Sequence, residues 1–589
     1  MPFQISPGVS VTETDLTLIV PTIATTPAAY CGAFKWGPAN EPVLVNSEKK
    51  LIEVFGTPDR DPAYARYWFV AQNFLQYGNN LRVVRVLQAE DDTASSGGAI
   101  HNIYNDASYL TNYTTNSAQG PWCARYPGVK GNSLKVVVLD HNPFTSPTDT
   151  TAENEYADFI DNFDDIPGTS VWAQSITNST TINDELHVLV IDAGGAFTGV
   201  AGTVLERFGF LSKAKNAKNA DGRSNYYADV INSTSQYIRW LTEPSMTNAT
   251  GTKVWGTDLV YGDSAFKVID DYIAGQNTQF TGGANKTLSD SILGDLEQDC
   301  AQAFETYFLE GEEIDVSLFI AGPMRATAAR KVIEVAEERK DCVAFVSPTN
   351  SVTNAEHDMS AFTLSDALTY RTNLGLSSSY GVMDSGYKLQ YDTYNDRYLY
   401  VPLNGDVAGC CVRTDTNKDP WFSPAGFDRG RIKNVVRLAY NPGKTDRDEL
   451  YKKSINPVVS FPGEGVVLFG DKTLLSRPSA FDRINVRRLF IVLEKAISTA
   501  SKFLLFEFND AFTRAQFVQL VSPYLRDVVG RRGIQDFRVV CDDSNNTPQV
   551  IDSNGFVGDI YIKPNRSINF IQLNFVATPT GVSFSEVGA

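Results

Sequence analysis

Histidine is the first side chain to consider for acid–base catalysis, because its imidazole titrates close to neutral pH. The chain has four histidines, which are His101, His141, His187 and His357. Each lies far from the others in sequence, so a catalytic arrangement would need a long-range convergence that no pattern here indicates. We interpret each of them as an ordinary surface or core residue, and we predict no catalytic residue.

Gly443-Lys444-Thr445 resembles the end of a phosphate-binding loop. That loop needs a second glycine five residues before Gly443, and this chain has Leu438 there. The G-x-S-x-G, G-x-G-x-x-G and H-E-x-x-H patterns of other enzyme classes are also missing from the sequence. These observations argue against an enzyme, and we expect no cofactor.

Two polar clusters have the composition of calcium sites. The first comprises Glu153, Glu155, Asp158, Asp161, Asp164 and Asp165. The second comprises Asp542, Asp543, Asn545, Asn546 and Asp552. The first cluster lacks the glycine and glutamate spacing of a calcium loop, and the second has Asn554 where such a loop, counted from Asp543, uses glutamate. We therefore favour solvated surface for the first cluster, a strand-to-strand turn for the second, and no metal site.

Composition bounds the class of protein. The 589 residues suggest three or four structural units, and no apolar run approaches the roughly 20 residues that span a bilayer. The N-terminus has no secretion signal, so we expect folding in a cytoplasm without membrane insertion. The seven cysteines have no C-x-x-C spacing and fit reduced thiols better than disulfides or a zinc site.

The net charge of −18 argues against wrapping nucleic acid, because phosphate binding needs a basic surface. The charge is uneven, since residues 431–589 hold 21 Lys and Arg against 16 Asp and Glu. One interpretation is a solvated acidic exterior around a more neutral C-terminal domain. The other is a basic C-terminal face that docks an acidic protein partner.

Hydrophobic patterns predict the elements that would position any site. In the N-terminal half we expect a helix over Ala63–Tyr77, a strand over Leu81–Leu87, and buried strands at Leu134–Leu139 and Leu186–Ile191. A strand from Val316, a helix over Thr327–Lys340 and a strand over Cys342–Val346 form an α/β unit. We expect a polar surface excursion at 89–125 and irregular structure at 349–430.

The last 160 residues carry the clearest helical periodicity. One helical face comprises Val486, Leu489, Phe490, Leu493, Ile497, Ala500 and Leu504. A second helical region covers Phe517–Val528, with Ser522-Pro523 as a possible restart. Strands are expected at Asp559–Ile562 and Ile568–Val576.

Both chain ends have the pattern of strand arms. Val9 and Val11 alternate with polar residues in a segment too poor in apolar residues for a core of its own. The C-terminal strand is apolar on both faces, through Ile568, Phe570, Ile571, Leu573 and Phe575. Such a strand needs cover on both sides, which a neighbouring subunit or its own chain can provide.

Ordered motifs along nearly the whole chain resemble the tail sheath proteins of contractile-tailed bacteriophages (myoviruses). The first is Ile5–Asp15 (ISPGVSVTETD). The others follow in order as Gly32–Pro38, Phe55-Gly56, Asn80–Val86, Ala124–Gly128, Gly131-Asn132, Asp221–Tyr227, Ala336–Cys342, Val540–Asp543, Asn545-Asn546, Asn554-Gly555 and Lys563-Pro564. No single match is decisive, and the order and coverage carry the resemblance.

The resemblance implies a structural subunit that polymerises as stacked hexameric rings around a tail tube. Contraction would drive the tube through the host cell envelope during genome delivery. The implied partners are other copies of the chain, the tail tube protein, and the baseplate and tail terminator proteins. The location would be the virion tail, after assembly in the host cytoplasm. The alternative is the sheath of a related contractile injection system, such as a bacteriocin particle or a secretion system.

The resemblance also implies a multidomain α+β or α/β fold with exchanged terminal β-strand arms and outward inserted domains. We expect an N-terminal arm at 1–20, a discontinuous middle domain at 21–88 plus 318–430, and inserted outer domains at 89–317. A C-terminal core domain at 431–565 and a C-terminal arm at 566–589 follow. The polar stretch 89–121, where some relatives carry a separate outer domain, is too short for one here.

Arg526, Arg531 and Arg532 lie close together near the end of the second helical region. We expect these arginines to face an acidic tube surface, because complementary charge sets register between two partners. The alternative is that they stabilise the C-terminal end of the helix.

Overall fold

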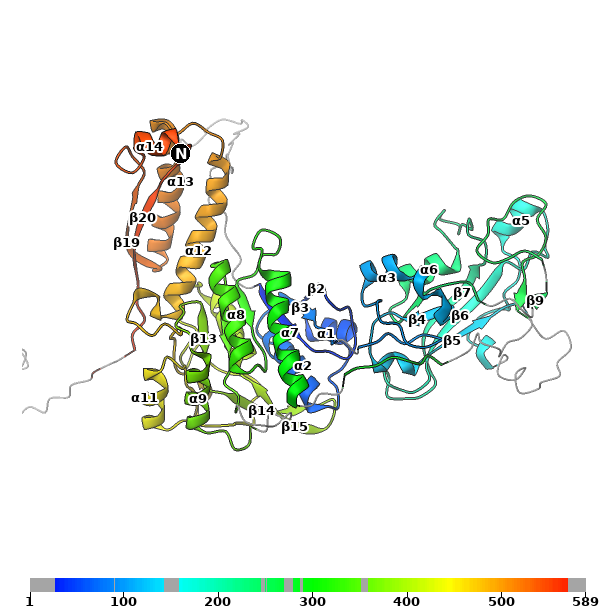
Figure 1. Ribbon diagram of the computed structural model, residues 1–589, viewed down its shortest axis with the longest axis horizontal. Coiled ribbons are helices and arrows are strands. Elements are labelled where there is room, and N and C mark those ends of the chain that lie inside the picture. Colours follow the sequence, from blue (N-terminus) through cyan, green and yellow to red (C-terminus); the bar gives the residue numbers. More distant parts are fainter. Residues whose placement is uncertain are drawn as a thin grey trace, which may run out of the picture.

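The computed structural model describes residues 27–88, 91–141, 158–244, 249–250, 252–269, 279–286, 290–350, 359–569 and 572. These residues form an elongated molecule of three units in a row: a helical C-terminal unit, a large central α/β unit and a smaller β-rich outer unit (Figure 1). The expected mixed α/β class is confirmed. Val9, Val11, Phe570, Ile571, Leu573 and Phe575 lie outside the described residues.

The central unit is built on a six-stranded sheet in the order β13-β12-β11-β1-β3-β2. Its strands are β1 (Ala28–Gly32), β2 (Pro42–Val45), β3 (Leu81–Arg85), β11 (Leu318–Ile320), β12 (Val343–Val346) and β13 (Gly381–Met383). All neighbours are parallel except β2 and β3. β1, β11 and β12 are buried along their whole length, as expected for parallel strands covered on both faces.

Helices cover this sheet. They are α1 (Glu48–Phe55), α2 (Pro62–Leu75), α7 (Asp290–Phe308), α8 (Ala326–Arg339), α9 (Leu364–Leu374) and α10 (Asn404–Asn417). α8 packs between α7 and α9, and α2 packs against α10. α2 begins where Pro62 fixes the first helical φ and the Asp61 carboxylate accepts from Ala63 N. The predicted helix at 63–77 and the predicted strand–helix–strand unit, β11–α8–β12, are confirmed.

The expectation of irregular structure at 349–430 is wrong for 359–430. It contains α9, β13, α10 and two further strands, β14 (Tyr387–Asp392) and β15 (Arg397–Pro402). β14 also pairs with β16 (Arg437–Leu438). The pattern is hidden because polar side chains such as Lys388, Gln390 and Asp406 are buried here, so polarity does not mark the surface.

The large hydrophobic core extends across two of the expected domain boundaries. It includes residues of α7, which lies within 89–317, and residues between Ile432 and Leu474, which lie within 431–565. The latter segment carries α11 (Lys444–Lys452) and the hairpin of β17 (Val458–Phe461) and β18 (Gly465–Leu468). These segments pack with the central sheet because their apolar side chains have no other core to join.

The outer unit has a separate core. Its main sheet joins β5 (Leu134–Leu139), β6 (Glu185–Asp192) and β7 (Thr203–Ser212), and its strand pairs are β4 (Trp122–Ala124) with β8 (Ile238–Trp240) and β9 (Ala249–Thr250) with β10 (Val268–Ile269). Its helices are α3 (Asp106–Asn112), α5 (Val171–Thr177) and α6 (Tyr227–Thr234), with 3₁₀ turns at Thr114–Gln119 and Val129–Ser133. The two predicted buried strands are confirmed as β5 and β6.

The expected surface excursion at 89–125 is confirmed only in part: among the described residues, most of 101–120 is exposed or half-buried, whereas the residues on either side contribute to the outer core. Ala94, Ser95 and Cys123 have no exposed surface. Ser95 can be buried because its hydroxyl hydrogen bonds to the carbonyl groups of Gly98 and Gln119. Its polarity therefore gives no information about exposure.

The C-terminal unit pairs two long helices with a small sheet. It contains α12 (Ile484–Ser501), a 3₁₀ turn at Lys502–Leu504, α13 (Ala511–Gly530), β19 (Ile534–Val540), α14 (Pro548–Asp552) and β20 (Asp559–Pro564). The predicted restart at Ser522-Pro523 is wrong, since α13 continues through Pro523. Pro523 and Gln519 both lie on the exposed side of α13. Proline has no N–H to donate to the Gln519 carbonyl, and water can hydrogen bond to that carbonyl instead, so the helix tolerates the proline.

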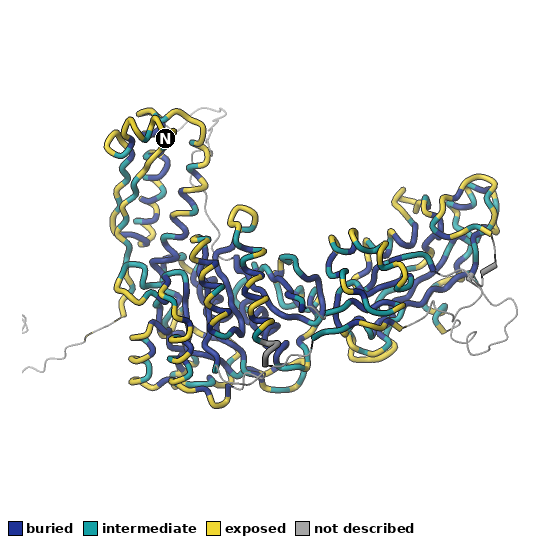
Figure 2. Tube along the Cα trace, in the orientation of Figure 1, coloured by how far each residue is buried: buried dark blue, intermediate teal, exposed yellow. Residues whose placement is uncertain are grey.

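Burial is continuous through the central and outer units, whereas the far end of the C-terminal unit is largely exposed (Figure 2). That end consists of the α12–α13 connection and the residues around α14.

Candidate assembly surface

The C-terminal sheet has open edges. β19 and β20 pair antiparallel from Ile534–Pro564 to Val540–Asp559, and among the described residues neither strand has a second neighbour. A two-stranded sheet is marginal by itself, and an unpaired edge presents N–H and C=O groups to any extended segment that approaches. The sheet is therefore a template for added strands.

One face of this sheet is only partly covered. Phe537, Val539, Ile560 and Ile562 pack against the core of α12 and α13, yet all four remain half-buried. Two strands are too narrow to cover two helices of about 20 residues each. Further strands at either edge would extend the apolar face and complete the cover.

The chain leaves this sheet immediately after β20. The Asn565 side chain donates to Arg532 O over 2.7 Å, and the Ser567 hydroxyl donates to Asp471 Oδ2 over 2.7 Å. Asn569 lies 2.8 Å from the Tyr451 hydroxyl. The segment 565–569 thus runs from its own sheet onto the large unit, and Ile568, 81% exposed, is not in a strand.

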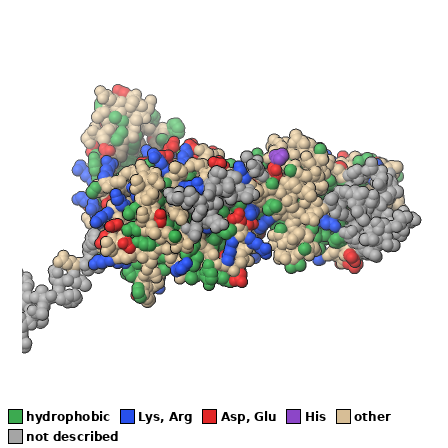
Figure 3. All heavy atoms as spheres, turned by 60° about the horizontal axis from the view of Figure 1, so that its bottom comes forward, with side chains coloured by type: hydrophobic (Ala, Val, Ile, Leu, Met, Phe, Trp, Pro, Cys, Tyr) green, Lys and Arg blue, Asp and Glu red, His purple; other side chains and the backbone are tan. Residues whose placement is uncertain are grey.

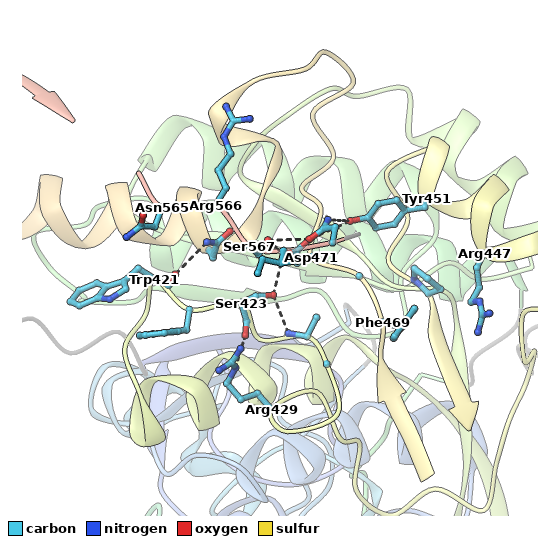
Figure 4. Close-up of a pocket in the computed structure, with 18 of the residues that line it drawn as sticks. Trp421, Ser423, Arg429, Arg447, Tyr451, Phe469, Asp471, Asn565, Arg566 and Ser567 are labelled. Carbon is cyan, nitrogen blue, oxygen red and sulfur yellow. Dashed lines mark hydrogen bonds between the residues drawn. The ribbon is translucent and has the colours of Figure 1, made fainter. Parts of the chain in front are cut away.

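This segment lies in a groove of about 720 Å³. Figure 4 shows Ser567 directed at Asp471, with Ser423 contacting the same carboxylate and Arg566 pointing away. Five basic side chains line the groove, and they are Arg429, Lys444, Arg447, Arg532 and Arg566. Figure 3 shows Lys and Arg side chains over the central unit, where they are mixed with Asp and Glu.

The three arginines expected to face a partner occupy different environments. All three are exposed. Arg531 pairs with Asp419 and lies over the Trp421 ring, whose Nε1 donates to Arg531 O. Arg531 therefore has a structural role at the end of α13, and Arg532 lines the groove.

The histidines do not converge on one site. His187 is buried between Phe163 and Phe210, where its Nδ1 accepts from Phe210 N, and burial lowers its pKa. His101 is exposed and pairs with Asp92. His141 lies 2.8 Å from the Pro167 carbonyl oxygen, and His357 lies outside the described residues.

Gly443-Lys444-Thr445 forms the start of α11. The Asp446 carboxylate accepts from Gly443 N and from the Tyr440 hydroxyl, and the Tyr440 hydrogen bond followed by the Gly443 bond lowers the pKa of Asp446. This carboxylate occupies the position where a bound phosphate would accept hydrogen bonds.

The second acidic cluster lies in the connection between β19 and β20, as expected, and α14 belongs to the same connection. Asp543 pairs with Arg514. The side-chain amide of Asn546 donates to Val557 O through Nδ2 and accepts from Val557 N through Oδ1. In the part of the chain that the structure describes, no group of three or more His, Cys, Asp or Glu side chains is arranged to hold a metal ion. All seven cysteines are buried and unpaired.

No helix among the described residues combines the length and the hydropathy needed to cross a bilayer.

Two features of the assembly surface were not predicted. β19 escapes detection because a bulge between Ile534 and Asp536 interrupts its alternation. The groove is formed by segments up to about 150 residues apart, from Trp421 to Asn569, and no local signal in the sequence marks it.

Family models match three parts of the chain. They describe the phage tail sheath C-terminal domain at 476–578, the phage tail sheath protein central domain at 301–474 and the N-terminal region of domain III of the tail sheath protein Gp18 at 25–86. The crystal structure of a sheath tail protein from Listeria innocua shares the fold, with a TM-score of 0.50, 11% identity and coverage of 92% of this chain and 96% of that chain.

Relatives match over the full length. The tail sheath protein of Enterobacteria phage T4 is 32% identical over an alignment of 661 residues, which covers 99% of both chains. That of Vibrio phage KVP40 is 34% identical over 683 residues, again with 99% coverage of both. The chain therefore belongs to the tail sheath protein family of contractile bacteriophage tails, a structural component of the virion tail.

Proposed function

We propose that this protein polymerises as stacked hexameric rings around a tail tube and contracts to drive the tube through the host envelope. The observation that carries the proposal is the route of residues 565–569, which leave an open-edged sheet and cross to another unit. The work is done by repacking of subunits, without catalysis, cofactor, nucleic-acid contact or membrane insertion.

Exchange of terminal arms would hold the rings together during this change. Val9 and Val11 of one arm, and Ile568, Phe570, Ile571, Leu573 and Phe575 of the other, would add strands to the β19–β20 sheets of neighbouring subunits. The half-buried face of that sheet supports this arrangement, because added strands complete its cover. Each backbone hydrogen bond contributes about 1 kcal/mol net, so several bonds per arm resist separation while the units rotate.

The division of labour follows the domain organisation that the sequence suggests. Arms at 1–20 and 566–589 would link subunits, and much of 89–317 would form the outward part. The bodies that move would be the central unit, whose core includes side chains between Ile432 and Leu474, and the helical C-terminal unit. Assembly would take place in the host cytoplasm, with the baseplate and terminator proteins bounding the sheath at its two ends.

Arm exchange is tested by deleting residues 1–18 or 566–589 and examining the products by electron microscopy. Each deletion should abolish tubes or give rings that separate on contraction. Circular dichroism of the truncated subunits should remain that of the full chain, which separates loss of assembly from loss of folding. The control is Val171→Ser in the outer unit, where Val171 is exposed. Normal contractile sheaths from both deletions would refute arm exchange.

Docking on the tube would use Arg526, Arg531 and Arg532. Because Arg531 already pairs with Asp419 of the same chain, R526E/R532E is the cleaner charge reversal. It should weaken assembly on isolated tubes and reduce the salt dependence of that assembly. Unchanged assembly and unchanged salt sensitivity would exclude docking through these side chains.

A further inference from the structure

The connection between α12 and α13 exposes a concentrated apolar surface. Five side chains here are each more than 60% exposed, and they are Phe503, Leu505, Phe506, Phe508 and Phe512. We name residues 503–512 the hairpin tip. It forms the top of the C-terminal unit in Figure 1 and is coloured as exposed in Figure 2.

Single exposed apolar residues are ordinary, but five within ten residues form a patch of the kind that marks a contact surface. Phe506 adds a conformational signal. Its φ of +72° is unfavourable for a side chain with a Cβ, and its aromatic ring is fully exposed. An unfavourable backbone conformation that places an aromatic ring in solvent favours a role for this ring in binding.

The described chain begins on the central unit, at the start of β11. The Pro27 carbonyl accepts hydrogen bonds from Ser317 N and Leu318 N at the start of β11. The preceding loop is joined to the end of α12 by the ion pairs Lys495–Asp315 and Lys502–Glu312, the latter at 3.0 Å. Lys502 directly precedes the tip, so Pro27 is connected to the tip through residues 312–317 and this ion pair.

The segment before Pro27 is long enough to reach the hairpin tip. The five residues from Glu312 to Ser317 span at most about 18 Å, and the ion pair between Lys502 and Glu312 adds roughly 10 Å of side chain. Residues 16–26 can extend over roughly 36 Å. A segment that starts at Pro27 can therefore run to the tip and cover it.

The sequence of that segment suits an apolar surface. Residues 16–26 read LTLIVPTIATT and contain no charged residue. Five of them are large aliphatic residues, namely Leu16, Leu18, Ile19, Val20 and Ile23. Val9 and Val11 lie further from Pro27 and stay available to a neighbour.

We propose that residues 16–26 dock on the hairpin tip of their own subunit. The segment covers the phenylalanine side chains, and the N-terminal arm leaves the molecule at a fixed point above α12. This docking concerns the unassembled subunit, so it holds whether or not arms are exchanged in the sheath.

The first test is cross-linking of the L18C/F506C variant with a short bismaleimide. The native cysteines are all buried and react slowly. The variant should give a cross-linked monomer whose yield does not change when the protein is diluted. L18C/Y261C is the matched control, because Tyr261 is also largely exposed but lies on the outer unit, and it should give no cross-link.

Two results of this test would overturn the proposal. Cross-linked dimers whose yield rises with concentration would assign the tip to a second copy of the chain. Cross-linking to added tube protein, with no product in the isolated subunit, would assign the tip to that partner.

A second variant tests the apolar contact directly. F506S/F508S/F512S should make thermolysin cleavage within residues 16–23 about tenfold faster, because the open form of the segment becomes more populated. V171S/Y261S is the control, because it removes two exposed apolar side chains from the outer unit. All these side chains are largely exposed, so the variants retain their cores. An unchanged cleavage rate would also overturn the proposal.

Discussion

The Ser567 hydroxyl donates a 2.7 Å hydrogen bond to the Asp471 carboxylate, which joins the segment after β20 to the large unit. Asp471 is almost fully buried and also accepts from Ser423, Tyr451 and Arg483. One carboxylate therefore connects a segment near the C-terminus with three other parts of the chain.

Replacing this carboxylate should release the C-terminal segment. D471A leaves four donors without their acceptor and should destabilise the groove by about 1–3 kcal/mol. Trypsin cleavage after Arg566 should become faster. S567A removes one neutral bond and should have a smaller effect, while D448N, which alters another carboxylate of the groove, should leave the rate unchanged. Equal rates for D471A and the parent chain would show that Asp471 does not hold the segment.

Lys388 and Asp406 form a fully buried ion pair, with Nζ 2.9 Å from Oδ2. K388M leaves a buried carboxylate without its cation and should lower the free energy of unfolding of the central unit by about 3–5 kcal/mol. K388M/D406L removes both charges and should recover most of that loss. Urea unfolding of the three proteins measures both effects, and a double variant as unstable as K388M would contradict the explanation.

Stability should fall with rising pH through Asp384. Burial raises the pKa of this carboxyl to about 8, although Ser347 and Gly386 donate hydrogen bonds to it. In the unfolded chain the group titrates near 3.9. Between these values the folded state keeps a proton that the unfolded state has lost, so stability decreases as pH rises, by about 1.4 kcal/mol per pH unit.

D384N cannot titrate and should remove this slope. Unfolding free energies at pH 5, 6, 7 and 8 compare the variant with the parent chain. D221N, at an exposed loop position, serves as the control and should keep the slope of the parent. A parent chain whose stability does not change over this range would be inconsistent with a protonated Asp384.

The outer unit should weaken in acid through His187. Burial lowers the pKa of this imidazole, whose Nδ1 must be unprotonated to accept from Phe210 N. The folded state therefore binds fewer protons than the unfolded state below about pH 6.5, and stability is lost as pH falls through that value. Hydrogen exchange of the β6 and β7 amides at pH 5 and pH 7.5 measures the change.

H187Q should keep an acceptor near Phe210 and abolish the pH dependence. H101Q is the matched control, because His101 is exposed and should contribute nothing to the exchange of these amides. If H101Q rather than H187Q removed the acid sensitivity, the assignment to His187 would be wrong.

Local patterns in the sequence determined several elements by themselves. The apolar face from Val486 to Ala500 predicts α12, because a helix with one buried side repeats every 3.6 residues. The runs at Leu134–Leu139 and Leu186–Ile191 predict β5 and β6, since both strands are covered on two faces. Ordered motifs along the chain identified the family that the comparisons confirm.

Other features, such as the burial of α10 and the pairing of buried charges, depend on tertiary structure and leave no local pattern in the sequence. α10 is buried on nearly all sides, and a Cβ at Gly409 would come within 2.4 Å of the Tyr77 ring, so the helix has no polar face from which to read a period. In the sequence, Lys388 and Asp406 have the character of surface residues. Only the folded structure shows that they are buried, because each neutralises the charge of the other.

The same distinction between sequence and tertiary structure applies to the assembly surface. The sequence by itself predicts a strand arm at each chain end, because the alternation of Val9 and Val11 and the apolar run from Ile568 to Phe575 are local properties. The position of Ser567 on Asp471, and of Lys502 beside Glu312, depends on segments far apart in the chain that only the packed units bring together. Long-range contacts of this kind decided where the segment after β20 lies on the large unit.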